Sequence, residues 1–77
     1  AKVIEKNIIS LEEKIKHILE FFKSLNETTF SNLIQKKDKQ EIIVTFLAIL
    51  HLARDGLILL EQNSHFSDII IKKHDKQ

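Results

Sequence analysis

The sequence has no cysteine and no methionine, and it contains a single glycine. Without cysteine there is no disulfide framework and no thiolate for catalysis or metal binding, which fits a reducing cytoplasm. The lack of methionine in a chain that begins with Ala1 indicates a piece of a longer protein. No apolar run approaches the roughly 18 to 20 residues that span a bilayer, and no signal-peptide pattern opens the chain. We therefore expect a cytoplasmic location and no membrane segment.

An excess of charge of one sign is also missing. Twelve Lys and Arg residues stand against eleven Asp and Glu, a net charge of +1, which gives little electrostatic reason to expect nucleic acid. The 43% hydrophobic and 30% charged residues are typical of one globular domain. A chain this short with no Gly-rich loop leaves little room for a pocket that shifts carboxylate pKa values. We expect neither catalysis nor a cofactor.

The first part of the chain predicts an extended opening segment and then a helix. Residues 1–9 are short and mixed, and they favour a short strand or extended segment. Ser10 and Glu13 have the spacing of a capping box, in which the Ser10 hydroxyl accepts from the Glu13 amide. Apolar residues at helical spacing follow and predict a helix over residues 11–25: Leu11, Ile15, Ile18, Leu19, Phe22 and Leu25.

Two brief elements are predicted next. Residues 28–30 favour a short strand because they are β-branched and aromatic. Ser31 and Asn32 then offer an N-cap for a short helix that ends near residue 35.

The longest helix is predicted between two strong end signals. Asp38 and Glu41 repeat the capping-box spacing and open it. The helix runs to about Arg54, and Gly56 closes it because glycine readily adopts the left-handed conformation at a helix C-terminus.

The end of the chain predicts a β-hairpin. Residues 57–62 and 66–71 are β-type runs, joined by the polar, turn-prone residues 63–65, and residues 72–77 form a charged tail. Two closely spaced helices followed by a hairpin are a helix-turn-helix with a wing. We predict an α+β winged-helix domain over residues 10–71, with three helices, a C-terminal hairpin and a short extra strand.

The helix before the wing bears on function. In a DNA-reading winged helix it enters the major groove and needs Arg, Lys, Asn or Gln to reach base edges and phosphates. Between Ile42 and Ala53 this helix has no Lys or Arg. At about 100° per residue its positions form two opposed apolar faces. The inward face is predicted to hold Ile42, Thr45, Ala48, Ile49 and Leu52, and the outward face Ile43, Phe46, Leu47 and Leu50, with Arg54 at its end.

The outward face has two interpretations. A helix that is hydrophobic all round is often central, so both faces are buried under the wing or the opening segment in the first interpretation. In the second, the outward face binds another protein, because a contiguous apolar patch with a polar rim is where partners dock. One small core can hardly cover both faces of a helix of about four turns, which favours docking.

Other candidate sites are weaker. The four histidines have no pair at helical i, i+4 spacing and no cysteine beside them, so we expect solvated side chains and no metal: His17, His51, His65 and His74. Residues 36–39 (KKDK) form a basic cluster at a helix start, where a winged helix can touch the DNA backbone. Asp38 interrupts the cluster, and a solvated turn is its usual explanation, so we do not expect a DNA contact here.

Several stretches resemble the C-terminal winged helix of kleisins, and among these the bacterial segregation and condensation protein A family. The most specific are residues 44–52 (VTFLAILHL), 55–62 (DGLILLEQ) and 66–69 (FSDI), supported by residues 10–15 (SLEEKI) and 29–33 (TFSNL). The likeness covers roughly residues 8–71. One departure is His65, where the family often has proline before the wing aromatic.

The resemblance implies a non-enzymatic, nucleoid-associated domain that binds the ATPase head of an SMC protein at its cap side. Such complexes close a ring used in chromosome condensation and segregation, and other subunits would bind the rest of the kleisin chain. The family docks through this third helix, and the resemblance carries over Phe46 and Leu50 as docking residues. With the rest of the outward face, the predicted partner-binding residues are Ile43, Phe46, Leu47, Leu50 and Arg54. The wing strands also offer a backbone edge for strand addition. The alternatives are a DNA-binding winged helix of a transcription regulator and a self-associating structural domain.

Overall fold

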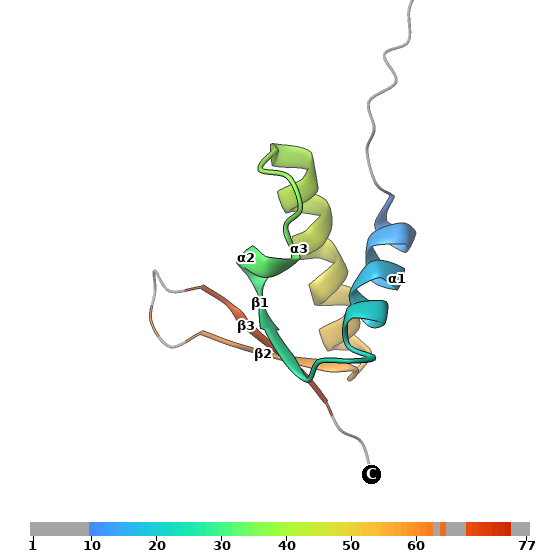
Figure 1. Ribbon diagram of the computed structural model, residues 1–77, viewed down its shortest axis with the longest axis vertical. Coiled ribbons are helices and arrows are strands. Elements are labelled where there is room, and N and C mark those ends of the chain that lie inside the picture. Colours follow the sequence, from blue (N-terminus) through green and yellow to red (C-terminus); the bar gives the residue numbers. More distant parts are fainter. Residues whose placement is uncertain (1–9, 63, 65–67, 75–77) are drawn as a thin grey trace, which may run out of the picture.

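The computed structural model describes residues 10–62, 64 and 68–74. Those residues form three helices and one three-stranded antiparallel sheet (Figure 1). The elements are α1 (Leu11–Phe21), β1 (Glu27–Thr29), α2 (Phe30–Leu33), α3 (Lys39–Arg54), β2 (Ile58–Glu61) and β3 (Ile70–Lys73). This order confirms the predicted α+β winged helix. The opening segment, most of the wing loop with His65, and the last three tail residues lie outside the described residues.

Helix α1 begins as predicted and ends earlier. The Ser10 hydroxyl accepts from the Glu13 amide at 3.1 Å, which is the predicted cap. The helix was predicted to reach residue 25 but stops at Phe21. There the amides of Lys23 and Ser24 bond to carbonyls three residues back, at 3.1 and 3.4 Å, and the chain tightens into a turn. Ser24 favours such a turn because its hydroxyl competes for backbone hydrogen bonds.

Strand β1 and helix α2 are each shifted from the predicted positions. Strand β1 spans Glu27–Thr29, one residue before the predicted range 28–30. The helix starts at Phe30, not after a Ser31–Asn32 cap, because the Thr29 hydroxyl accepts from the Asn32 amide at 3.3 Å and serves as the N-cap. It ends at Leu33, two residues before the predicted end. The Gln35 amide leaves the helical pattern and donates to the Glu41 carboxylate at 3.1 Å.

Helix α3 has both predicted ends. The Asp38 carboxylate accepts from the Glu41 amide at 2.9 Å, and the helix runs to Arg54. Gly56 follows with a φ of 78°, the left-handed conformation that the sequence predicts at this helix end.

The hairpin has the predicted place, but its second strand is shifted toward the C-terminus: β3 spans Ile70–Lys73, whereas the sequence predicted residues 66–71. Strand β3 lies between β1 and β2, with Ile71 opposite both Thr28 and Leu60. Lys72 and Lys73, predicted as tail, belong to this strand. They do so because the ladder continues past the core: the Lys73 amide donates to the Asn26 carbonyl at 2.8 Å.

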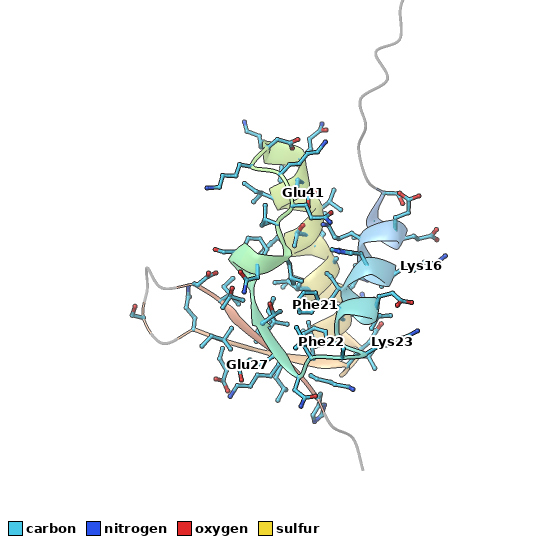
Figure 2. The ribbon with its side chains drawn as sticks, viewed as in Figure 1. Lys16, Phe21, Phe22, Lys23, Glu27 and Glu41 are labelled. Atoms are coloured by element: carbon cyan, nitrogen blue, oxygen red, sulfur yellow. The ribbon has the colours of Figure 1, made fainter. Side chains whose placement is uncertain are left out.

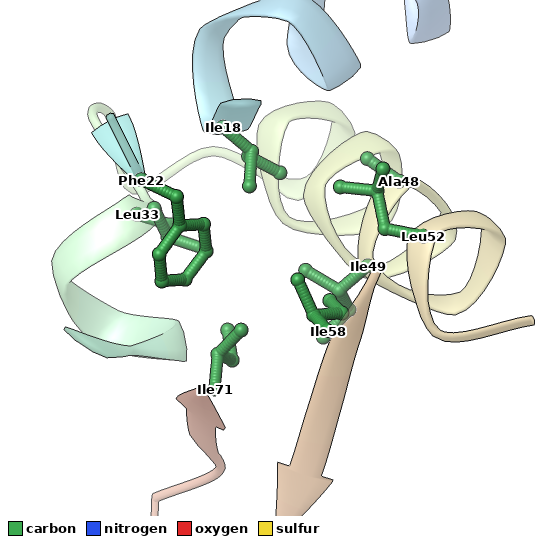
Figure 3. Packing of buried hydrophobic residues seen from close by; sticks show 8 residues of the cluster. All are labelled: Ile18, Phe22, Leu33, Ala48, Ile49, Leu52, Ile58 and Ile71. Carbon is green, nitrogen blue, oxygen red and sulfur yellow. The ribbon is translucent and has the colours of Figure 1, made fainter. Parts of the chain in front are cut away.

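The core lies where α1, α3 and one face of the sheet meet (Figure 3). It draws on every helix and on the wing strands, and its fully or nearly fully buried members are Ile18, Phe22, Leu33, Ala48, Ile49, Leu52, Ile58 and Ile71. Side chains from elements far apart in sequence therefore hold α3 against α1 and the sheet, with one face of α3 turned inward.

A buried ion pair that was not predicted from the sequence joins the three helices. The Lys14 ammonium of α1 is fully buried and lies 2.6 Å from the Glu41 carboxylate of α3. Figure 2 shows Glu41 on the first turn of α3. The Lys14 ammonium also lies 3.5 Å from the Leu33 carbonyl of α2. Glu41 accepts from the Gln35 amide as well. The pair therefore fixes the loop between α2 and α3 against α1.

We predict that Lys14→Met destabilises the domain by about 3 to 5 kcal/mol, because it leaves the Glu41 carboxylate buried without its counter-charge. The double variant Lys14→Met/Glu41→Leu should recover most of this loss, since an apolar pair removes the buried charges together. Urea unfolding followed by circular dichroism measures both. A Lys14→Met domain as stable as wild type would contradict the structural role of the pair.

We also predict acid sensitivity from Glu41. Burial alone would raise the pKa of this carboxyl, but the hydrogen bonds from Lys14 and the Gln35 amide hold the pKa below its ordinary range. A lowered folded-state pKa contributes stability that is complete above the unfolded value and is lost as pH falls through the folded one. Stability should therefore drop below about pH 5, and less steeply in Glu41→Gln.

Urea unfolding at a series of acidic pH values provides the comparison. Some slope remains in Glu41→Gln, because the Ser31 hydroxyl and nearby amides also hold the pKa of Asp68 below its ordinary range. Identical slopes for the two proteins would show that Glu41 does not contribute.

Candidate functional site

The outer side of α3 is an exposed apolar surface. Five of the nine large hydrophobic side chains exposed in the described part of the chain belong to this one helix, each between 41% and 49% exposed. We call this surface the α3 face, and its residues are Ile42, Ile43, Phe46, Leu47 and Leu50. A concentration of apolar side chains on one exposed helix is uncommon in a monomeric protein and marks interaction surfaces.

The structure bears out most of the predicted division of α3. Thr45, Ala48, Ile49 and Leu52 are buried as predicted, and the outward residues Ile43, Phe46, Leu47 and Leu50 are exposed. Ile42 was predicted to face inward, and that prediction is wrong, because it is 41% exposed. Glu41 takes the inward position one turn before Thr45 instead, held by the ion pair with Lys14.

The first interpretation placed both faces of α3 under the wing or the opening segment. The described wing strands do not cover the α3 face, and the opening segment lies outside the described residues. The strands of the wing pack on the inward side, where Ile58 and Ile71 meet Ile49 in the core. The buried Thr45 hydroxyl needs no hydrogen bond from another protein, because it donates to the Glu41 carbonyl of the same helix at 2.7 Å. The inward face of α3 is thus complete, and the α3 face is an additional surface.

Phe46 is held in place on this surface. Its ring meets the Phe30 ring of α2 edge to face, with the centroids 6.1 Å apart. Such a pair adds a small stabilisation beyond simple burial and limits ring motion. Phe46 therefore presents an ordered aromatic edge, which lowers the entropy lost when a partner covers it.

A hollow lies beside the α3 face, between α2, the following loop and the start of α3. We call it the α2 hollow. Its volume is about 280 Å³, and its lining residues are Phe30, Ser31, Ile34, Lys37 and Ile42. Ile42 belongs to both the hollow and the α3 face, so the two features are continuous.

Charged side chains stand at the two ends of the α3 face. Lys36, Lys37 and Lys39 are exposed at its N-terminal end. At its C-terminal end, the Arg54 guanidinium lies 3.2 Å from His51 Nδ1 and 3.6 Å from the Asp55 carboxylate. Arg54, the fifth predicted binding residue, is thus exposed at the rim of the apolar surface, and its binding role stays a prediction.

Asp68 ties the wing to α2. Its carboxylate accepts from the Ser31 amide at 3.3 Å and the Ile69 amide at 3.0 Å. The Phe30 amide also donates to the Ile69 carbonyl at 2.9 Å. A carboxylate at a helix start is favourable because the free amides there carry partial positive charge. These hydrogen bonds join the residues just before β3 to the first turn of α2, beside the α2 hollow.

The histidines were expected to be solvated and not to bind a metal, and His65 lies outside the described residues. Within residues 10–62, 64 and 68–74, no three His, Cys, Asp or Glu side chains gather as a metal site would require. His74 Nδ1 lies 2.9 Å from the Gly56 carbonyl, and the His17 Nδ1 is buried with no hydrogen-bond partner among the described residues. No helix in the described part of the chain is long and apolar enough to cross a membrane.

Solved structures support the winged-helix fold. The chain is similar to one described as the crystal structure of the SmcHead bound to the C-winged helix domain of ScpA, with a TM-score of 0.66 and 23% identity. The match covers 82% of this chain and 91% of that chain. At this identity the likeness shows a shared fold.

Sequence comparisons show the family. Two relatives are segregation and condensation protein A of Clostridium acetobutylicum, 41% identical over 91% of this chain, and that of Bacillus licheniformis, 39% identical over 88%. The chain spans 28% of the length of each. The model of the family described as segregation and condensation protein ScpA matches residues 1–74. The chain belongs to the ScpA family of segregation and condensation proteins.

Proposed function

We propose that this chain is a non-enzymatic C-terminal kleisin domain that docks on the ATPase head of an SMC protein through the α3 face. The main support is that α3 exposes five large apolar side chains on one face. Its opposite face already packs in the core. The winged helix of the similar structure is bound to an SmcHead. Family membership and an unoccupied apolar face therefore support the same partner.

The wider role follows from the family. The domain would help to close an SMC–kleisin ring in chromosome condensation and segregation, at the nucleoid in the cytoplasm. The relatives are more than three times as long as this chain, which spans 28% of their length. The rest of such a protein would bind the other subunits of the complex.

Binding would rest mainly on burial of apolar surface. Covering Phe46 and Leu50 should contribute about 1.5 to 3 kcal/mol each in area terms, less the cost of association. Exposed Arg54 at the rim and the lysines at the opposite end suit electrostatic steering more than affinity. Of the two wing strands, only β2 is an edge strand, because β3 is paired on both sides. The outer edge of β2 provides a second place for contact by strand addition.

Direct duplex binding is not part of the proposal. The helix that would enter the groove has no Lys or Arg between Gln40 and Ala53. Phosphate contacts supply most non-specific affinity for DNA and require such cations. The basic residues around Asp38 lie at the start of the helix, away from its exposed middle.

We predict that Leu50→Arg weakens binding to the SMC head by at least about tenfold, because it places a charge in the apolar centre of the contact. Phe46→Arg should do the same, although it also removes the contact with Phe30. The measurement is calorimetric titration of the domain against the isolated ATPase head of the SMC protein from the same organism. Circular dichroism first establishes that each variant is folded.

Leu19→Arg provides the matched control. Leu19 is 40% exposed, similar to Leu50 at 43%, but it lies on α1, the helix that packs against the inward side of α3. Its substitution should leave the affinity within about twofold of wild type. Absence of wild-type binding would overturn the proposed partner. Binding that survives the Leu50 and Phe46 substitutions would move the contact away from the α3 face.

A further inference from the structure

The α2 hollow is the feature that the proposed docking through α3 does not yet use. At about 280 Å³ it lies below the usual size of a small-molecule or cofactor site. Its walls are mainly apolar, from Phe30, Ile34 and Ile42. This size and lining suit an anchoring side chain of a protein partner, the type of contact that carries most of the energy in protein interfaces.

The hollow is continuous with the docking surface. Ile42 lines the hollow and stands one helical turn before Phe46 on the α3 face. Phe30, on the opposite wall, touches Phe46 edge to face. A partner that covers Phe46 therefore lies over the mouth of the hollow, and it leaves apolar walls in contact with water unless one of its side chains enters.

The hollow is held open before binding. The loop on one side is fixed by the bond from the Gln35 amide to Glu41, which is itself paired with buried Lys14. On the other side the Ser31 amide is bonded to Asp68 at the end of the wing loop. A preformed hollow costs a partner less ordering entropy than one that must open.

The mouth of the hollow is positively charged. Lys37 lines it, and the exposed Lys36 and Lys39 are neighbours in sequence. None of these lysines makes an ion pair within the part of the chain that the structure describes. The nearby carboxylates are engaged elsewhere: Asp38 caps α3, Glu41 is paired with Lys14, and Asp68 accepts from the Ser31 and Ile69 amides. The rim therefore favours a partner with a carboxylate beside its apolar side chain.

We infer that the α2 hollow receives an apolar anchor side chain of the SMC head, next to an acidic residue that pairs with Lys37. The inference rests on the proposed function and adds a second contact to it. The anchor fills the space between Phe30, Ile34 and Ile42, and the acidic neighbour stays at the rim, where salt screens its attraction.

Two matched pairs of variants test the inference by calorimetric titration against the same SMC head. Ile34→Ala and Leu19→Ala remove the same number of side-chain carbons, but only Ile34 lines the hollow, and neither residue belongs to the α3 face. Lys37→Glu and Lys23→Glu reverse the same charge, and Lys23 lies beyond α1 on the other side of the molecule (Figure 2). Each titration is run at low and high salt.

Ile34→Ala should weaken binding about tenfold or more, against less than about twofold for Leu19→Ala. Lys37→Glu should weaken binding about fivefold at low salt, with a smaller effect at high salt, and Lys23→Glu should have no effect.

If the wild-type domain binds and the two members of either pair behave alike, the inference is wrong while the proposed function stands. If the wild type does not bind the head, both fail together. A wild-type dimer that dissociates in Ile34→Ala, seen by sedimentation, would assign the hollow to a second copy of this chain and also overturn the inference.

Discussion

Inside the domain, the Lys14 ammonium and the Glu41 carboxylate meet at 2.6 Å with almost no access to water. A buried charge is tolerated only when its partner and its hydrogen bonds are in place, so this pair permits one arrangement of three helices. It places Glu41 inward, which turns Ile42 outward, and it holds the Gln35 amide and the loop that walls the α2 hollow. The buried Lys14–Glu41 pair therefore determines which residues of α3 are exposed at the start of the helix.

Helix α3 divides its apolar residues between two uses. Thr45, Ala48, Ile49 and Leu52 complete a core with α1 and the sheet. The residues of the α3 face exceed what so small a domain can cover, since a short chain has a high ratio of surface to volume. A domain of this size has too little interior to bury both apolar sides of one helix, so a binding partner is the better explanation for the exposed side.

Local chemistry made much of the fold predictable. Ser10, Asp38 and Gly56 mark helix ends through hydrogen bonds or dihedral angles that depend on neighbouring residues alone. Features set by distant contacts were not predictable. The choice between Glu41 and Ile42 as the inward residue depends on Lys14, 27 positions away. A visible sign was that Lys14 stands one turn before Ile18 in an otherwise apolar stripe. The hollow joins segments whose approach only the tertiary structure defines.

The sheet order places β3, the last described strand along the chain, between β1 and β2. Before β3 is synthesised, β1 has no partner strand and the core lacks Ile71. Pairing across so long a separation is slow compared with local helix formation. On the ribosome, α3 is therefore made before the sheet that orients it, and an interrupted chain presents the same apolar residues without a defined surface. Only a domain translated through β3 has the complete sheet against which α3 packs, so the α3 face takes its final position when this part of the protein is complete.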